Sequence, residues 1–255
     1  MTNGLRTYEW HDTHCHLDFA PQALDVARNA PWPMVSMTVD PRDYEPTRNS
    51  FSPFNNVHVA AGLHPWWIAD GRCGRAEASL LAQLVETTSF VGEVGLDFSQ
   101  RHEGSEDEQI WAFDLVIGES ARIGGKIVSI HSLRSADTVL DVLDRHGTCS
   151  SCACILHWFS GSSEQLHRAI EMGCYFSVNE RMMATGRGRE YAKVMPADHI
   201  LLETDLPTRQ GEPCSADDLL RSLQNTLEAV ETACKRPCLD ELARTSALLL
   251  GAVTR

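Results

Sequence analysis

Residues 12–18 read DTHCHLD. They overlap the end of a segment near residues 8–13 that is typical of a first β-strand, and they continue beyond it. Histidines follow this strand where a doubly wound nucleotide-binding sheet would carry a glycine-rich phosphate turn, so that fold is disfavoured. Successive side chains of an extended strand point to opposite faces, and His14 and His16 therefore project from the same side. Both imidazoles can reach one metal ion, so the sequence predicts a metal site at the end of the first strand.

Along the rest of the chain, short runs of residues that favour β-strands alternate with stretches in which apolar residues have the spacing of a helix. Right-handed β-α-β units produce a parallel sheet, and eight of them fit a closed barrel of about 250 residues. We therefore predict an α/β fold of the TIM (β/α)8 barrel type, slightly distorted, with a doubly wound open sheet as the alternative. The expected strands span residues 8–13, 33–38, 57–61, 90–94, 127–130, 154–156, 174–178 and 200–202, and the clearest helical faces are Ile110, Phe113 and Ile117; Ala136, Val139, Leu140 and Leu143; and Leu220, Leu223, Leu227 and Val230.

The chain has 255 residues, of which 43% are hydrophobic and 22% are charged, and its formal net charge is -13. This composition excludes a disordered or collagen-like protein, and its evenness along the chain predicts a single domain over residues 1–255. The acidic balance argues against coating of nucleic acid or of an anionic membrane by bulk charge, although bound divalent cations can dominate a local field. No run approaches the roughly 18 apolar residues of a spanning helix, and no signal peptide is recognisable, so a cytoplasmic protein is expected.

Many of the cysteines and histidines are assigned structural roles. The nine cysteines form an odd number in a chain too long to need disulfides, so most are expected to be reduced thiols. Neither the group at residues 149, 152 and 154 nor the pair at 234 and 238 has the repeated C-x2-C spacing of a structural zinc site. The histidines that end no expected strand are His58, His102, His146, His167 and His199.

Side chains that can bind metals recur where the expected strands end: Asp12, His14, His16, His64, Glu93, His131, His157 and Asp205. The carboxyl ends of parallel barrel strands share one face, so these residues should meet in one mouth. Four imidazoles and two carboxylates exceed the three protein ligands of one open site, and they suit two metals that share a carboxylate. We predict Glu93 as the bridge. His14, His16 and Asp205 complete the shell of one ion, and His131 and His157 complete that of the other.

Six strings occur in order between residues 12 and 207: DTHCHLD, GLHP, GEVGLD, IHS, HWFSG and ETDLP. Their order and spacing resemble the TatD family of metal-dependent deoxyribonucleases. The resemblance implies a metallo-dependent hydrolase barrel of the amidohydrolase-like superfamily with the same six metal ligands, and it places His64 and Glu203 in the catalytic mouth. More narrowly, GEVGLD, the stretch after His131, LHWFSG and CYFSVN resemble the TatD-type component of Qat anti-phage defence systems. That resemblance implies a bacterial protein with other Qat components as partners.

The substrate side of the mouth departs from the family pattern. The family usually has an arginine two residues after the fifth-strand histidine, whereas that position is Leu133 here and the arginine is Arg134. Trp158 stands where a small residue or cysteine is usual, and it could stack on an unpaired base or belong to the core. We predict that Arg134, Arg181 and Trp158 contact substrate. Arg181 opens a basic stretch that could grip a phosphate backbone or form a solvated helix face: Arg187, Arg189, Lys193 and Arg209.

The predicted reaction is hydrolysis of a phosphodiester with two divalent ions, Mg, Mn or Zn, and the predicted partner is DNA in single-stranded form. Asp205 would take the proton of the attacking water. His64 would contact the phosphate or the leaving group, or would only shape the GLHP turn, and Glu203 would hold a ligand histidine or pair with a neighbouring cation. Two alternatives stay open: an amidase, lactonase or small phosphoester hydrolase on the same metals, and a non-catalytic scaffold in a defence complex.

Overall fold

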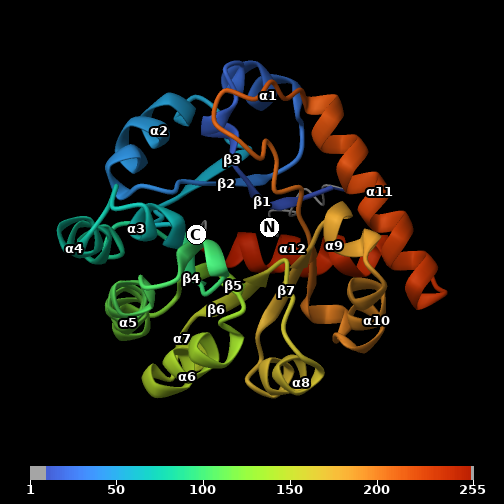
Figure 1. Cartoon of the computed structure of the whole chain (residues 1–255). Helices are drawn as coiled ribbons and strands as arrows, with labels where there is room; N and C mark the ends of the chain where they lie inside the picture. The colour runs from blue at the N-terminus through green and yellow to red at the C-terminus, as the bar shows by residue number, and fades with distance from the viewer. Residues whose placement is uncertain (1–9, 254–255) are drawn as a thin grey trace, which may run out of the picture.

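The computed structural model describes residues 10–253, in which eight parallel strands form a ring surrounded by helices (Figure 1). Strands that follow one another in the chain are neighbours in space, in the orders β1-β2-β3 and β4-β5-β6-β7-β8. The strands are β1 (Asp12–Cys15), β2 (Met34–Met37), β3 (Val57–Ala60), β4 (Phe90–Asp97), β5 (Ile127–Leu133), β6 (Ala153–His157), β7 (Tyr175–Val178) and β8 (Ile200–Leu202). The predicted parallel α/β barrel is confirmed.

The eight strands form two hydrogen-bonded sheets, which meet at two seams. At each seam a few isolated hydrogen bonds replace a continuous β-ladder. Between β3 and β4 the link is a parallel bridge from Ala61 to Val91. Between β8 and β1, the Thr13 hydroxyl donates to the Leu202 carbonyl at 3.0 Å, and the backbone N–H after β8 donates to the His14 carbonyl at 2.9 Å. The interrupted strand pairing at these two seams distorts the barrel from a regular closed sheet.

Helices form the outer layer, and the apolar faces expected for them point inward. In α5 Phe113 and Ile117 are buried, in α6 all four predicted residues are buried, and in α11 Leu223 and Val230 are buried. The helices are α1 (Ala23–Asn29), α2 (Tyr44–Phe51), α3 (Pro65–Ala69), α4 (Arg75–Leu84), α5 (Glu106–Ile123), α6 (Ala136–His146), α7 (Thr148–Ser151), α8 (Ser163–Glu171), α9 (Glu180–Ala184), α10 (Gly186–Val194), α11 (Ala216–Cys234) and α12 (Leu239–Val253), with 3-10 turns η1 (Leu17–Phe19), η2 (Pro41–Asp43), η3 (Gln100–His102) and η4 (Ala197–His199).

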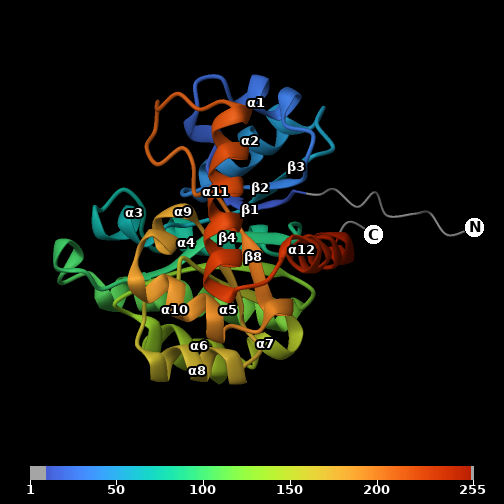
Figure 2. The same cartoon turned by 90° about the vertical axis from the view of Figure 1, so that its right-hand side faces the viewer.

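The two ends of the barrel are closed differently. At the end where the strands begin, α12 packs Leu249 and Leu250 against an apolar cluster of the barrel interior that includes Met37, Phe90 and Leu201. Figure 2 shows α12 at one end of the molecule and α3 and α9 at the other. Because α3 follows β3 and α9 follows β7, the strand carboxyl ends face away from α12. The mouth is therefore the open end.

The predicted ends of two strands were wrong. β4 continues to Asp97 and β5 to Leu133, so Glu93 and His131 lie inside strands and not at their ends. In β4, Gly92 and Gly95 interrupt the apolar run, and glycines normally weaken a strand interior. Gly95 is required here because a Cβ at that position would lie 2.1 Å from the carbonyl oxygen of His131. For β1, which begins at Asp12, the predicted earlier start falls outside the described residues.

Among residues 10–253, no helix combines the length and the apolar character needed to cross a bilayer.

Candidate metal centre and active site

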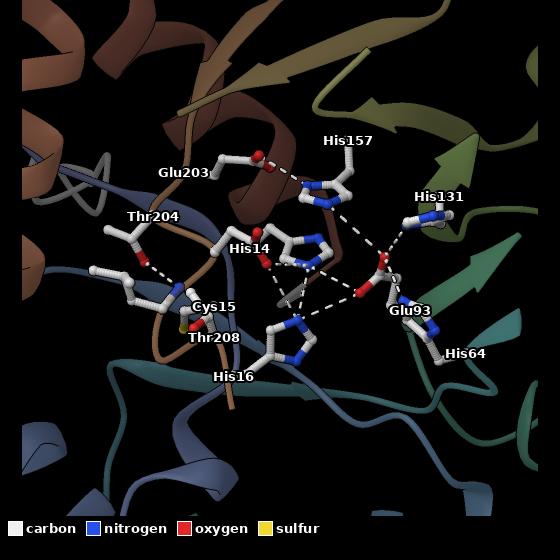
Figure 3. Close-up of polar contacts among 12 residues, drawn as sticks. His14, Cys15, His16, His64, Glu93, His131, His157, Glu203, Thr204 and Thr208 are labelled. Atoms are coloured by element: carbon white, nitrogen blue, oxygen red, sulfur yellow. Dashed lines mark hydrogen bonds and ion pairs between the residues drawn. The ribbon is translucent and has the colours of Figure 1, made fainter. Parts of the chain in front are cut away.

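Polar side chains from both sheets converge at the mouth of the barrel (Figure 3). The structure brings together all six residues predicted as metal ligands, together with His64 and Glu203: His14 from β1, His16 after it, His64 after β3, Glu93 from β4, His131 from β5, His157 at the end of β6, and Glu203 and Asp205 after β8. Glu93 is 2% exposed and Asp205 is 15% exposed. Asp205 is thus the carboxylate of the cluster that solvent can reach.

Four potential ligand atoms lie close together, and those of His14, His16 and Asp205 are all within 4.8 Å of one another. Glu93 Oε2 lies 3.4 Å from Nε2 of both His14 and His16, and these two nitrogens lie 3.4 Å apart. Asp205 Oδ1 lies 3.4 Å from His16 Nε2 and 3.9 Å from His14 Nε2. A tetrahedral ion with bonds of about 2.0–2.1 Å holds its ligand atoms about 3.3–3.4 Å apart. The four side chains therefore fit a divalent metal ion.

The other oxygen of Glu93 faces a second group of nitrogens. Oε1 lies 2.9 Å from His131 Nδ1, 3.2 Å from His64 Nε2 and 3.8 Å from His157 Nε2. The pairing register between β4 and β5 shifts beside Glu93, and such irregularities re-aim a side chain next to an active site. One carboxylate thus separates two sets of imidazoles, as a bridging ligand does. His64 lies closer to Oε1 than the predicted ligand His157 does.

Glu203 acts on the site through His157. Its Oε1 lies 2.8 Å from His157 Nδ1 and accepts a second hydrogen bond from the Asn179 amide at 2.7 Å. With its proton on Nδ1, His157 presents an unprotonated Nε2 to the metal site. Glu203 is fully buried, and its carboxylate orients the imidazole of His157 through this hydrogen bond. The sequence interpretation missed Asn179, although it follows β7 at the same edge of the barrel.

Two further imidazoles lie next to polar residues that the sequence interpretation missed. The Ser129 hydroxyl lies 2.8 Å from His14 Nδ1, and Asp97 Oδ2 lies 3.4 Å from His131 Nε2. The indole N–H of Trp66 donates to the same Asp97 oxygen. The position of Asp97 at the end of GEVGLD is the signal that could have identified it.

The tautomer of His64 is set by the helix that follows it. His64 is the N-cap of α3, and its Nδ1 accepts a hydrogen bond from the backbone N–H of Trp66 at 3.1 Å. In the neutral ring the proton must therefore sit on Nε2, the atom that faces Glu93. Burial lowers the pKa of His64 more than Glu93 raises it, which favours this neutral form. His64 is consequently a hydrogen-bond donor toward the site, whereas a ligand would need a bare Nε2.

Charges within the cluster are strongly coupled. Burial alone would raise the pKa of Glu93, but the imidazoles around it hold that pKa well below its ordinary value. Burial alone would lower the pKa of His157, but Glu203, Glu93 and Asp205 raise it to about 9. Without a metal ion, the cluster is therefore a carboxylate surrounded by at least one imidazolium.

We expect metal binding to compete with protons. His157 must lose its proton to bind a metal, so the apparent affinity should rise about tenfold per pH unit for each proton released, up to pH about 9. In the metal-free protein the raised pKa stabilises the fold fully below pH 6.5, and this contribution is lost as the pH rises through about 9. Metal titrations between pH 6 and 9, in buffers of different ionisation enthalpy, measure the protons released. A pH-independent affinity would contradict the assignment.

Backbone conformation marks the rim of the mouth. Among residues 10–253, four non-glycine residues have positive φ, and three of them stand in this rim: Arg134 at 55°, Trp158 at 40° and Asp205 at 55°. Such conformations are costly for L-residues and cluster at functional sites. Arg134 is exposed directly after β5.

Arg181 and Trp158 lie next to Asp205. The Arg181 guanidinium pairs with Asp205 Oδ2 and donates to the Asp205 carbonyl at 3.1 Å, and its Cζ lies 4.7 Å from the centre of the Trp158 ring. Trp158 is only partly buried. Two residues of the remaining basic stretch are engaged elsewhere: Arg189 donates to carbonyls at the end of α9, and Lys193 pairs with Glu190.

A parallel barrel with imidazoles and carboxylates converging at the strand carboxyl ends defines a class of proteins, the barrel-fold hydrolases that depend on divalent metals. Within that class, the model of the family described as TatD related DNase matches residues 11–244. The chain belongs to this family and is a hydrolase acting on ester bonds.

The chain is also similar to individual proteins, in sequence and in structure. The chain is 28% identical to "3'-5' ssDNA/RNA exonuclease TatD" of Pantoea ananatis over 65% of its length and 68% of the relative's. It is 25% identical to "Uncharacterized metal-dependent hydrolase YjjV" of Escherichia coli over 91% of its length and 93% of the relative's. The crystal structure of YjjV has the same fold, with a TM-score of 0.79 at 23% identity over 97% of this chain and 98% of that one.

Proposed function

We propose that the protein hydrolyses phosphodiester bonds of single-stranded DNA with two divalent ions, and that residues 1–255 form one domain in the cytoplasm. The observation that carries the two-ion proposal is the position of Glu93, whose two oxygens face two different sets of imidazoles. The name of the Pantoea relative, a single-stranded DNA and RNA exonuclease, supports the substrate class.

Each ion has its own ligand set. Glu93 Oε2, His14, His16 and Asp205 would hold one ion, and Glu93 Oε1, His131 and His157 would hold the other. Ions in these positions supply Lewis acidity, which acidifies water and neutralises phosphate charge. Among Mg, Mn and Zn, the nitrogen-rich donor set favours Zn, because imidazole suits Zn whereas Mg and Mn prefer oxygen ligands.

The chain itself supplies the proton transfers and the orientation of substrate. Asp205 accepts the proton of the attacking water, since Arg181 pairs with its Oδ2 and its Oδ1 faces the site. The Nε2–H of His64 donates a hydrogen bond to a phosphate oxygen or to the leaving oxygen. Glu203 contributes as a positioning residue, by holding His157.

DNA is gripped locally, because a net charge of -13 disfavours extended contact with a polyanion. Trp158 and Arg181 offer an aromatic face and a guanidinium beside Asp205, and Arg134 offers a second cation on the same rim. This arrangement fits an unpaired base next to the phosphate that is cleaved.

Replacing Trp158 by Ala should raise KM for single-stranded DNA by about 5- to 150-fold with little change in kcat, because stacking contributes about 1–3 kcal/mol per base. Trp111→Ala is the matched control, since Trp111 also stacks with an arginine but on the outer layer, between α4 and α5. Steady-state kinetics on a labelled single strand provide the measurement. Equal KM values for the two variants would remove Trp158 from the binding site.

The proposed activity is tested by incubating metal-loaded protein with labelled single-stranded DNA, duplex DNA, RNA and small phosphoesters, amides and lactones, each with Mg, Mn or Zn. We expect cleavage of single strands in preference to duplex. No cleavage of DNA under any metal, together with turnover of a small substrate, would favour the alternative hydrolase on the same metals.

We further propose that the protein acts in anti-phage defence with other Qat components, on the strength of the GEVGLD, LHWFSG and CYFSVN stretches. Phage challenge of cells that carry the complete system tests this. Loss of protection with Glu93→Ala or His157→Ala would show that metal-dependent catalysis is needed, whereas full protection would favour a scaffold.

A further inference from the structure

Three thiols lie together at the end of the barrel opposite the metal centre. Cys149 lies in the short helix α7, Cys154 is the second residue of β6, and Cys174 directly precedes β7. His157 ends β6, so Cys154 lies three residues, about 10 Å of extended strand, from the nearest proposed metal ligand. The proposed hydrolysis uses none of these thiols.

Cys149 and Cys174 are within reach of each other. Their sulfurs lie 3.7 Å apart, and both are free thiols. A disulfide needs about 2.05 Å between sulfurs, so a side-chain rotation that closes less than 2 Å would join them. Cys149 is partly exposed, whereas Cys174 is fully buried. An oxidant therefore meets Cys149 first.

The neighbouring thiols favour the thiolate form of Cys149. Hydrogen bonds from Cys154 and Cys174 lower the pKa of Cys149, although burial opposes this effect. The pKa values of Cys154 and Cys174 are raised by Cys149 and by burial. A thiolate is the reactive form of cysteine, and partial exposure gives it access to a small oxidant.

Cys152 offers a contrast within the same segment. Its thiol is buried and donates to the Ser120 carbonyl at 3.2 Å, so it points to an oxygen acceptor. Cys73 donates to Asp40 in the same way, and Cys15 donates to the Val35 carbonyl. Cys149 is partly exposed and its sulfur lies beside a second sulfur. Cys234 is also partly exposed and lies beside Cys238, but the thiols of this pair donate to the carbonyls of Ala192 and Arg236.

We propose that Cys149 and Cys174 form an oxidation site, at which a peroxide converts the two thiols into a disulfide. The Cys149 sulfur attacks one oxygen of hydrogen peroxide, the O–O bond breaks, and the second oxygen leaves as water with the proton of the thiol. The Cys174 sulfur then attacks the sulfenic acid of Cys149, the S–O bond breaks, the S–S bond forms and a second water leaves. Two thiols are oxidised, and one peroxide is reduced to two waters.

The site is tested on the full-length, metal-loaded protein with a few equivalents of hydrogen peroxide. After the reaction is quenched, free thiols are alkylated under denaturing conditions, disulfides are reduced and labelled with a heavy reagent, and peptides are mapped by mass spectrometry. We expect Cys149 and Cys174 to become oxidised together, ahead of the other seven cysteines, and to recover with dithiothreitol.

Variants separate the roles of the two sulfurs. Cys149→Ser should leave Cys174 reduced at the same peroxide dose, whereas the matched control Cys152→Ser should form the disulfide at the wild-type rate. Cys174→Ala, with its fold checked by circular dichroism, should stop at a sulfenic acid on Cys149 that dimedone traps. Prior oxidation of any other cysteine, or a disulfide from Cys149 to Cys154, would overturn the proposal. None of these outcomes depends on nuclease activity.

Discussion

Glu93→Gln is expected to lower DNA hydrolysis by on the order of a thousandfold or more and to remove at least one of the two bound ions. The substitution keeps the shape of the side chain but replaces one anionic oxygen with an NH2 group that cannot bind a metal. The carboxylate lies within 4 Å of five imidazoles, and its loss leaves them without the negative charge that holds them together. Elemental analysis of the purified protein and single-turnover cleavage of labelled DNA measure the two effects.

Glu228→Gln is the matched control, because Glu228 is exposed on α11 and should leave both readings unchanged. If Glu93→Gln retained two ions and activity within tenfold of the wild type, Glu93 would not be a bridging ligand.

Asp205→Asn should lower kcat by on the order of a thousandfold while leaving much of the metal in place. The amide oxygen can still face the ion, but an amide cannot accept the proton of the attacking water. Asparagine tolerates positive φ, so the backbone at φ 55° should keep its conformation. The part of the acidic limb that comes from protonation of Asp205, whose pKa is lowered to about 2, should disappear.

The comparison for this variant is Asp198→Asn, in an exposed residue that pairs with His199 far from the mouth. An Asp205→Asn enzyme with wild-type kcat would show that another group takes the proton.

Strand periodicity predicted where most of the site would be, because residues distant in sequence meet wherever parallel strands end. His14, His16, His157 and Asp205 could be identified in this way. Glu93 and His131 were identified correctly as members of the cluster, although their strands run further than predicted. For β4, the reason is that Gly95 is needed for the close approach of β5, and the sequence of β4 alone does not show this requirement.

Other parts of the site depend on three-dimensional contacts that no local pattern contains. Ser129 is one polar residue in an apolar strand, and only its distance from His14 shows that it orients an imidazole. The sequence does not show whether His64 binds a metal or donates a hydrogen bond. The hydrogen bond from the Trp66 backbone N–H to its Nδ1 distinguishes these two roles. Cys149 and Cys174 are 25 residues apart, and the β6–β7 pairing brings them together.

The position of α12 has a practical consequence for single-molecule work. This helix seals the barrel at the end remote from the mouth, with Leu249 and Leu250 against the interior strands. A surface tether attached to the outer face of α12, for instance at the exposed position of Leu248, would leave the mouth on the side away from the support. Cleavage of a long strand could then be followed without the support blocking its entry.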